Sequence, residues 1–165
     1  MRFAIFLSAI LLSLSACKSD KAPKEDISTL EAKLAKEPDQ ATLQNLLVLY
    51  QEEAQKSTGE AKLEFLWKTG ETARAVREFS VAEKSFMEIY EGHTDHELAG
   101  KALFLHAFMC DEDLRQFDKA KVLYESFLEK YPQSDFNDDA QFLLQHLGKS
   151  DEEMLELLSK GNEEK

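Results

Sequence analysis

The side chains that could bind a metal or carry out catalysis are histidines, cysteines and carboxylates. The chain has four histidines and two cysteines: His93, His96, His106 and His146, with Cys17 and Cys110. His93 and His96 lie close together, but no cysteine or acidic metal-binding motif accompanies them. A zinc site needs three or four converging ligands. We therefore expect no metal site and no cofactor, and we place this histidine pair in a loop between helices.

Nucleophilic catalysis has no better support. Cys110 lies among apolar residues at helical spacing, which predicts a buried small hydrophobe rather than a reactive thiolate. The sequence contains no local Ser–His–acid or Cys–His arrangement and no glycine-rich phosphate loop. The abundant carboxylates are interpreted as solvated helix faces. These observations predict a protein that is not an enzyme.

The charge balance limits the class of partner. The 165-residue chain carries 32 acidic and 20 basic residues, a formal net charge of −12. Such a surface repels nucleic acid and anionic lipid headgroups. We therefore expect no nucleic-acid partner, and any contact with a membrane needs another means of attachment.

The N-terminus suggests that means. A short positive start, Met1-Arg2, precedes an apolar run from Phe3 to Leu14, which ends in Leu14-Ser15-Ala16-Cys17. This pattern resembles the signal peptide and lipobox of bacterial lipoproteins. The resemblance implies a signal peptide over residues 1–16, cleavage before Cys17 and lipidation of that cysteine. Several acyl chains anchor a protein firmly, whereas one binds only marginally. The alternative is an ordinary secretory signal in which Cys17 is incidental.

The residues after the lipobox suggest where in the cell the protein is located. Lys18, rather than aspartate, follows the cysteine, so the resemblance implies the outer membrane, with the protein facing the periplasm. Residues 17–25 are polar, include Pro23 and lack an apolar period. They are interpreted as a flexible tether between the anchor and the folded part.

Helical periodicity runs through the rest of the chain. Apolar residues at spacings of three and four predict about eight antiparallel helices and no strand, over 26–36, 41–55, 62–77, 80–90, 96–111, 117–131, 137–147 and 150–160. Ser150 and Glu153 form a capping box at the start of the last helix. The fold class is all-α, with one helical domain over residues 26–160 and a frayed tail over residues 161–165.

Two of the helices repeat a pattern. The second of these helices repeats the residue pattern of the first: Ala120, Tyr124 and Phe127 match Ala82, Phe86 and Ile89. Each matched pair is 38 residues apart, and we call this distance the repeat interval. Small residues allow paired helices to approach closely, and aromatic rings fill the space next to them. The distance from Gly70 to Ala82 is twelve residues, and that from Ala107 to Ala120 is thirteen. The second turn therefore carries one extra residue.

This pattern resembles the tetratricopeptide repeat (TPR) family, a stack of helix pairs that is stable only as a stack. The resemblance covers about residues 63–147. Segments that look like small repeat lipoproteins of Bacteroidota are Phe104-Leu-His-Ala-Phe108, Phe117-Asp-Lys-Ala120, Tyr131-Pro-Gln-Ser-Asp135 and Leu147-Gly-Lys-Ser-Asp-Glu-Glu153. Thr94 stands where the earlier repeat should carry proline. Pro38 suggests that the first helix is the second of a pair, whereas counting back in pairs makes it the first; both remain open.

The resemblance also suggests a binding surface. We assume that one repeat position is shared by Gly70, Ala107 and Gln145. The position three residues earlier is then shared by Trp67, Phe104 and Phe142. In the TPR family this earlier position faces the concave groove. Phe108 follows Phe104 by one turn, and charge preference along the groove is assigned to Glu64, Lys101 and Asp139. The alternative is that these rings pack between helices, which is the usual role of such stripes.

Two functions of different class follow. The first is a membrane-anchored TPR scaffold that binds an unidentified protein or peptide partner in the bacterial cell envelope, as part of outer-membrane or envelope assembly. The second is a periplasmic lipoprotein that captures a small ligand or metal. An open groove favours the first function, and an enclosed cavity with converging polar groups favours the second.

Overall fold

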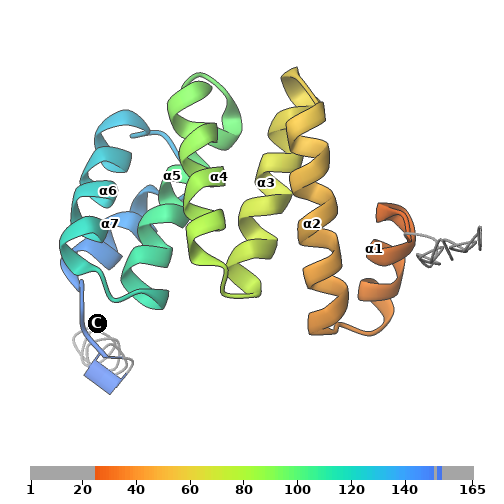
Figure 1. Cartoon of the computed structure of the whole chain (residues 1–165). Helices are drawn as coiled ribbons and strands as arrows, with labels where there is room; N and C mark the ends of the chain where they lie inside the picture. Colours follow the sequence, from red (N-terminus) through yellow and green to blue (C-terminus); the bar gives the residue numbers. More distant parts are fainter. Residues whose placement is uncertain (1–24, 151, 154–165) are drawn as a thin grey trace, which may run out of the picture.

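The computed structural model describes residues 25–150 and 152–153. These residues form seven α-helices, one short π-helix and no strand, so the predicted all-α class is confirmed. The α-helices are α1 (Ile27–Lys36), α2 (Gln40–Lys56), α3 (Gly59–Ala75), α4 (Phe79–Gly92), α5 (Glu97–Phe108), α6 (Phe117–Lys130) and α7 (Asn137–Gln145). They follow one another in a row, from α1 at one end to α6 and α7 at the other (Figure 1). No helix in the described part is long and apolar enough to cross a bilayer.

Local sequence signals set the helix ends. Asp26 and Asp39 precede α1 and α2, and each carboxylate accepts the backbone N–H three residues on at 2.8 Å. This bond satisfies one of the donors that a helix start leaves without a partner. At the other end, α6 stops at Lys130, directly before Tyr131 and Pro132. Proline lacks a backbone donor and disfavours helical geometry in the residue before it.

Alternate helices are joined by ion pairs and contacts. Glu31 of α1 lies 3.1 Å from Lys68 of α3, and α3 contacts α5. Glu83 of α4 pairs with Lys119 of α6. The odd-numbered helices α1, α3 and α5 therefore lie together, as do α4 and α6. Whichever place α3 and α5 take in a helix pair, α1 therefore takes the same one.

The core repeats as the sequence predicts. The matched residues Ala82, Phe86 and Ile89 of α4 and Ala120, Tyr124 and Phe127 of α6 are all 0% exposed. Ala102 and Ala140, which are separated by the same repeat interval, are likewise 0% exposed. Equivalent positions are therefore buried equally in the two units.

The turns after α3 and α5 repeat as well. Arg77 and Arg115 are one repeat interval apart, and both have positive φ, at 66° and 55°. Positive φ is uncommon for residues other than glycine. Each guanidinium lies over the ring two residues later, 5.2 Å from the centroid of Phe79 and 4.6 Å from that of Phe117. A cation–π contact thus accompanies the same turn in both repeats.

The extra residue of the second repeat has a definite place. Seven steps separate Gly70 from Arg77, and eight separate Ala107 from Arg115. Between the latter two, the chain forms the π-helix Met109–Asp113. A π-helix commonly absorbs a single inserted residue without breaking the helix. As a result, Asp111 points inward and is only 2% exposed.

Several helix boundaries differ from the predicted ones, by one to three residues. α3 begins at Gly59 rather than residue 62, because Thr58 is extended (φ −136°) and the positive φ of Gly59 (59°) starts the turn. α5 gives way to the π-helix after Phe108, and α7 ends at Gln145 rather than residue 147.

The chain ends fall largely outside the description. The predicted signal peptide (1–16), the tether (17–25) except its last residue and the tail (161–165) lie outside the described residues. The eighth predicted helix (150–160) does too, except for its start. There the capping box is confirmed: the Ser150 N–H donates to the Glu153 carboxylate at 2.8 Å, and the Glu153 N–H donates to the Ser150 hydroxyl at 3.3 Å.

Candidate functional site: the face shared by α3 and α5

One stripe of α3 is rich in polar groups around a single aromatic ring. Glu60, Glu64, Trp67, Glu71 and Arg74 follow one another at spacings of four, three, four and three. These spacings place all five side chains on one face of the helix. Trp67 is the only tryptophan of the chain, and its side chain is partly exposed.

Beside this stripe lies an open hollow, which we call the tryptophan hollow. Its volume is about 520 Å³, and the residues that line it come from α3 and from the start of α5: Glu60, Leu63, Glu64, Trp67, His96, Glu97 and Leu98. The hollow therefore combines one large ring and two leucines with three carboxylates. Surfaces of this mixed kind suit side chains with an apolar stem and a charged end.

Packing fixes the indole of Trp67. Its ring meets that of Phe86 edge to face, with centroids 6.1 Å apart. An interaction with Trp67 opposes the rise that partial burial causes in the pKa of Glu71. A ring held in this way loses little conformational freedom when it binds a partner.

Trp67 and Phe104 occupy the same repeat position but differ in what covers them. Phe104 lies 6.1 Å from Tyr124, the counterpart of Phe86. Phe136 also stacks on Phe104, with centroids 4.9 Å apart, and leaves it 7% exposed. In the first repeat the position of Phe136 is held by Leu98, one repeat interval earlier. A leucine covers less of a neighbouring ring, and Trp67 stays partly exposed.

His96 holds one edge of the tryptophan hollow. Its Nδ1 atom accepts the backbone N–H of Leu98 at 3.1 Å, so in the neutral ring the proton sits on Nε2. Nε2 lies 3.1 Å from a carboxylate oxygen of Glu60 and donates to it. One side chain therefore caps the start of α5 and ties it to α3.

A second contact joins the opposite ends of these helices. Arg74 of α3 pairs with Asp113, the last residue of the π-helix. The same guanidinium lies 4.9 Å from the ring centroid of Phe108. A further open hollow of about 430 Å³ begins here, lined in part by Glu71, Arg74 and Asp113. The face between α3 and α5 is thus tied at both ends.

The other aromatic residues predicted to line the groove lie in different surroundings in the structure. Phe104 belongs to the core and offers almost no surface to a partner. Phe108 is partly buried between Phe104 and Arg74. Phe142 of α7 is partly buried and packs on His146, with centroids 4.5 Å apart.

The charged groove residues also lie apart. Glu64 lines the tryptophan hollow and pairs with Lys68 at 3.1 Å. Lys101 lines a different hollow, between the loop after α4 and the loop after α6. Asp139 is exposed on α7. Of the seven predicted groove residues, Trp67 and Glu64 are the two that the structure brings together in the tryptophan hollow. Sequence reasoning missed His96, Glu97 and Leu98, because the repeat pattern does not mark the residues that start a helix.

A buried polar cluster lies between α4, α5 and α6. His106 is 1% exposed, its Nδ1 atom lies 3.2 Å from the Tyr90 hydroxyl, and its Nε2 atom lies 3.8 Å from Glu83. Burial, aided by Lys119, lowers the pKa of His106 to about 4. Burial raises the pKa of the neighbouring Cys110 thiol to about 11. Cys110 is 0% exposed, which confirms the predicted small hydrophobe.

Other chemistry finds little support in the described part of the chain. No group of three or more histidine, cysteine, aspartate or glutamate side chains there could hold a metal ion. The two cluster members with catalytic potential, His106 and Cys110, are closed to a substrate by burial.

Comparison with known proteins adds no family assignment. No family model matches the sequence, and no curated protein matches it.

Proposed function

We propose that this protein is a membrane-anchored interaction module of the TPR type, which binds a protein partner in the bacterial cell envelope without chemical catalysis. The observation that carries the proposal is the difference between Trp67 and Phe104. Both rings take the same repeat position, yet only Trp67 is left partly exposed beside an open hollow. Exposed aromatic rings on a rigid helix are typical binding hot spots.

The TPR arrangement is supported by repetition at several levels. Core alanines, core aromatics and the turns at Arg77 and Arg115 all recur at the same repeat interval. Helix pairs that repeat in this way bury their apolar faces against their neighbours. The resulting stack presents the first helices of successive pairs side by side, as α3 and α5 are here, and this is the face that we assign to the partner.

The proposed location in the cell envelope rests on the lipobox. In this proposal residues 1–16 are removed, Cys17 carries the lipid, and residues 17–25 link it to the helices on the periplasmic side of the outer membrane. The helical unit would thus be held close to outer-membrane proteins, which supports a role in their assembly. Cys17→Ser tests the anchor, because a serine hydroxyl cannot form the thioether. Mass spectrometry of the N-terminal peptide should find lipid on wild-type Cys17 and none on the variant; an unmodified wild-type Cys17 contradicts this location.

Site-specific photo-crosslinking tests the binding face. A photoreactive amino acid replaces Glu64, which lines the tryptophan hollow, or Val122, which is 63% exposed on α6. In growing cells, position 64 should form a discrete adduct with one envelope protein, and position 122 should not. Identical adducts from both positions, or none from position 64, would contradict a binding role for this face.

A further inference from the structure

The tryptophan hollow has a one-sided charge. Three carboxylates line it, from Glu60, Glu64 and Glu97, and no lysine or arginine does. His96 is the only other titratable side chain in its wall, and its Nε2–H is engaged with Glu60. A negatively charged ligand would meet carboxylates on both the α3 side and the α5 side.

These carboxylates keep acceptor capacity for a ligand. Glu60 receives one hydrogen bond from His96 at 3.1 Å, and Glu64 faces Lys68 at 3.1 Å. Glu97 is exposed at the start of α5 and makes no ion pair within the described residues. A carboxylate offers about four lone-pair sites, so each group can accept from an incoming donor without losing its present partner.

We infer that the tryptophan hollow takes an arginine or lysine side chain of the protein partner, next to an aliphatic residue. The inference rests on the proposed function and states the chemistry of its partner. A cation close to an indole gains from the negative face of the ring, and nearby carboxylates add charge-assisted hydrogen bonds. Leu63 and Leu98 give the neighbouring apolar residue its contact. Arginine is favoured over lysine, because its planar fork can stack on the indole and bind a carboxylate through two N–H groups.

The test uses Trp67 as its own probe. Because Trp67 is the only tryptophan of the chain, its fluorescence in the purified full chain reports from the hollow. The ligands are a short peptide of alternating arginine and leucine, its citrulline version and its glutamate version. The arginine peptide should shift the emission and bind more weakly as salt rises, whereas the citrulline peptide should bind at least about fivefold more weakly. The glutamate peptide should not bind.

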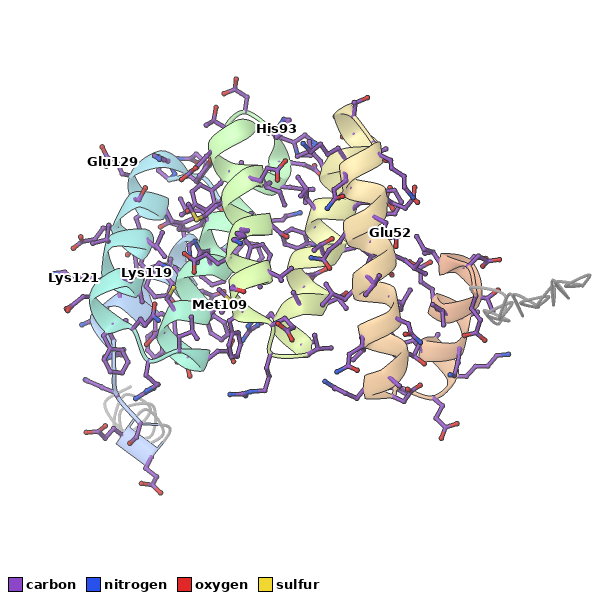
Figure 2. All side chains as sticks on the ribbon, viewed as in Figure 1. Glu52, His93, Met109, Lys119, Lys121 and Glu129 are labelled. Carbon is purple, nitrogen blue, oxygen red and sulfur yellow. The ribbon has the colours of Figure 1, made fainter. Side chains whose placement is uncertain are left out.

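Paired variants separate the hollow from the overall acidity of the protein. The double variant Glu64→Gln, Glu97→Gln should lose affinity for the arginine peptide by at least about fivefold. The matched control is the double variant Glu125→Gln, Glu129→Gln, which removes the same charge from exposed positions on α6. Figure 2 shows Glu129 at the end of the molecule formed by α6 and α7. The control should change affinity by less than about twofold, as expected of charges far from the site.

Three results overturn the inference: no emission shift with the arginine peptide, equal binding of the citrulline peptide, or equal losses in the two double variants. The last of these means binding to the acidic surface in general. None of them bears on the crosslink expected from position 64, which tests the proposed function separately. A discrete crosslink together with equal citrulline binding would therefore keep the binding face and reject a cationic partner.

Discussion

A Cβ atom added to Gly70 would lie 2.5 Å from Cε1 of the Phe86 ring. Phe86 is 0% exposed and packs against Trp67, so its ring cannot easily move away. Overpacking costs about 1–3 kcal/mol, and alanine recovers up to about 1 kcal/mol over glycine inside a helix. Gly70→Ala should therefore lower the free energy of unfolding by about 1–2 kcal/mol in a denaturant titration. Gly92→Ala is the control, since nothing lies within 4 Å of its added Cβ; equal stability of the two variants would contradict this packing.

Ala120 tests the repeat register. It is 0% exposed on α6, and Ala120→Arg would combine overpacking with an unpaired buried charge. We expect thermal denaturation to show a loss of several kcal/mol, a large share of a typical total of about 5–15 kcal/mol. Val122→Arg, at a position 63% exposed on the same helix, should change stability by less than about 0.5 kcal/mol. If Ala120→Arg melts within a few degrees of the wild type, Ala120 does not lie at a helix crossing.

The repeated core could be predicted from the sequence, because it depends on the spacing of residues that are close together in the chain. Ala82 and Ala120 could be paired from their alanine–aromatic pattern alone. The turns at Arg77 and Arg115 could also have been found, since Arg-Glu-Phe79 and Arg-Gln-Phe117 lie one repeat interval apart. The sequence also indicated one extra residue in the second repeat.

The candidate site could be predicted less well from the sequence, because contacts between residues far apart in the chain determine which side chains line it. Trp67 and Phe104 share a position, but their exposure depends on Leu98 and Phe136, which come from the following helix pair in each case. The contact between His96 and Glu60 joins residues 36 positions apart. No local pattern predicts such a bond, and none predicts that the extra residue would take the form of a π-helix.

Burial of His106 predicts a stability that depends on pH. Burial, with a smaller effect of Lys119 and an opposing one of Glu83, lowers the pKa of this imidazole to about 4 in the folded protein, against about 6.5 in an unfolded chain. Between these values the unfolded state binds more protons, so this contribution is intact above about pH 6.5 and is lost as the pH falls towards 4. The loss amounts to about 3 kcal/mol.

The variant His106→Asn isolates this contribution. Asparagine does not titrate and can still accept a hydrogen bond from Tyr90. Denaturant titrations between pH 7 and pH 4 should give a flatter dependence of unfolding free energy on pH for the variant than for the wild type. Equal slopes would mean that His106 does not titrate differently in the folded and unfolded states.

Leu98→Phe offers a way to close the tryptophan hollow while Trp67 and the three carboxylates stay in place. Leu98→Phe places a ring where Phe136 stands one repeat later, and by analogy with the stacking of Phe136 on Phe104 it should cover Trp67. We expect unfolding free energy to change by less than about 1.5 kcal/mol, as for hydrophobic replacements that fit their site. Fluorescence quenching of Trp67 by acrylamide should fall, and the crosslink from position 64 should weaken. Undiminished quenching and crosslinking would contradict the idea that Leu98 leaves the ring open.

The most direct test of the binding face compares Trp67→Ala with Phe104→Ala, two truncations at the same repeat position. Thermal melting and capture of the partner found by crosslinking are measured on both variants. Phe104→Ala should cost about 3–5 kcal/mol of stability, as expected for a buried ring. Trp67→Ala should cost clearly less, yet weaken capture by about 2 kcal/mol or more, as expected for an exposed hot spot. A loss of stability for Trp67→Ala as large as that for Phe104→Ala, with capture by the folded variant unchanged, would show that Trp67 is a core residue and contradict the account.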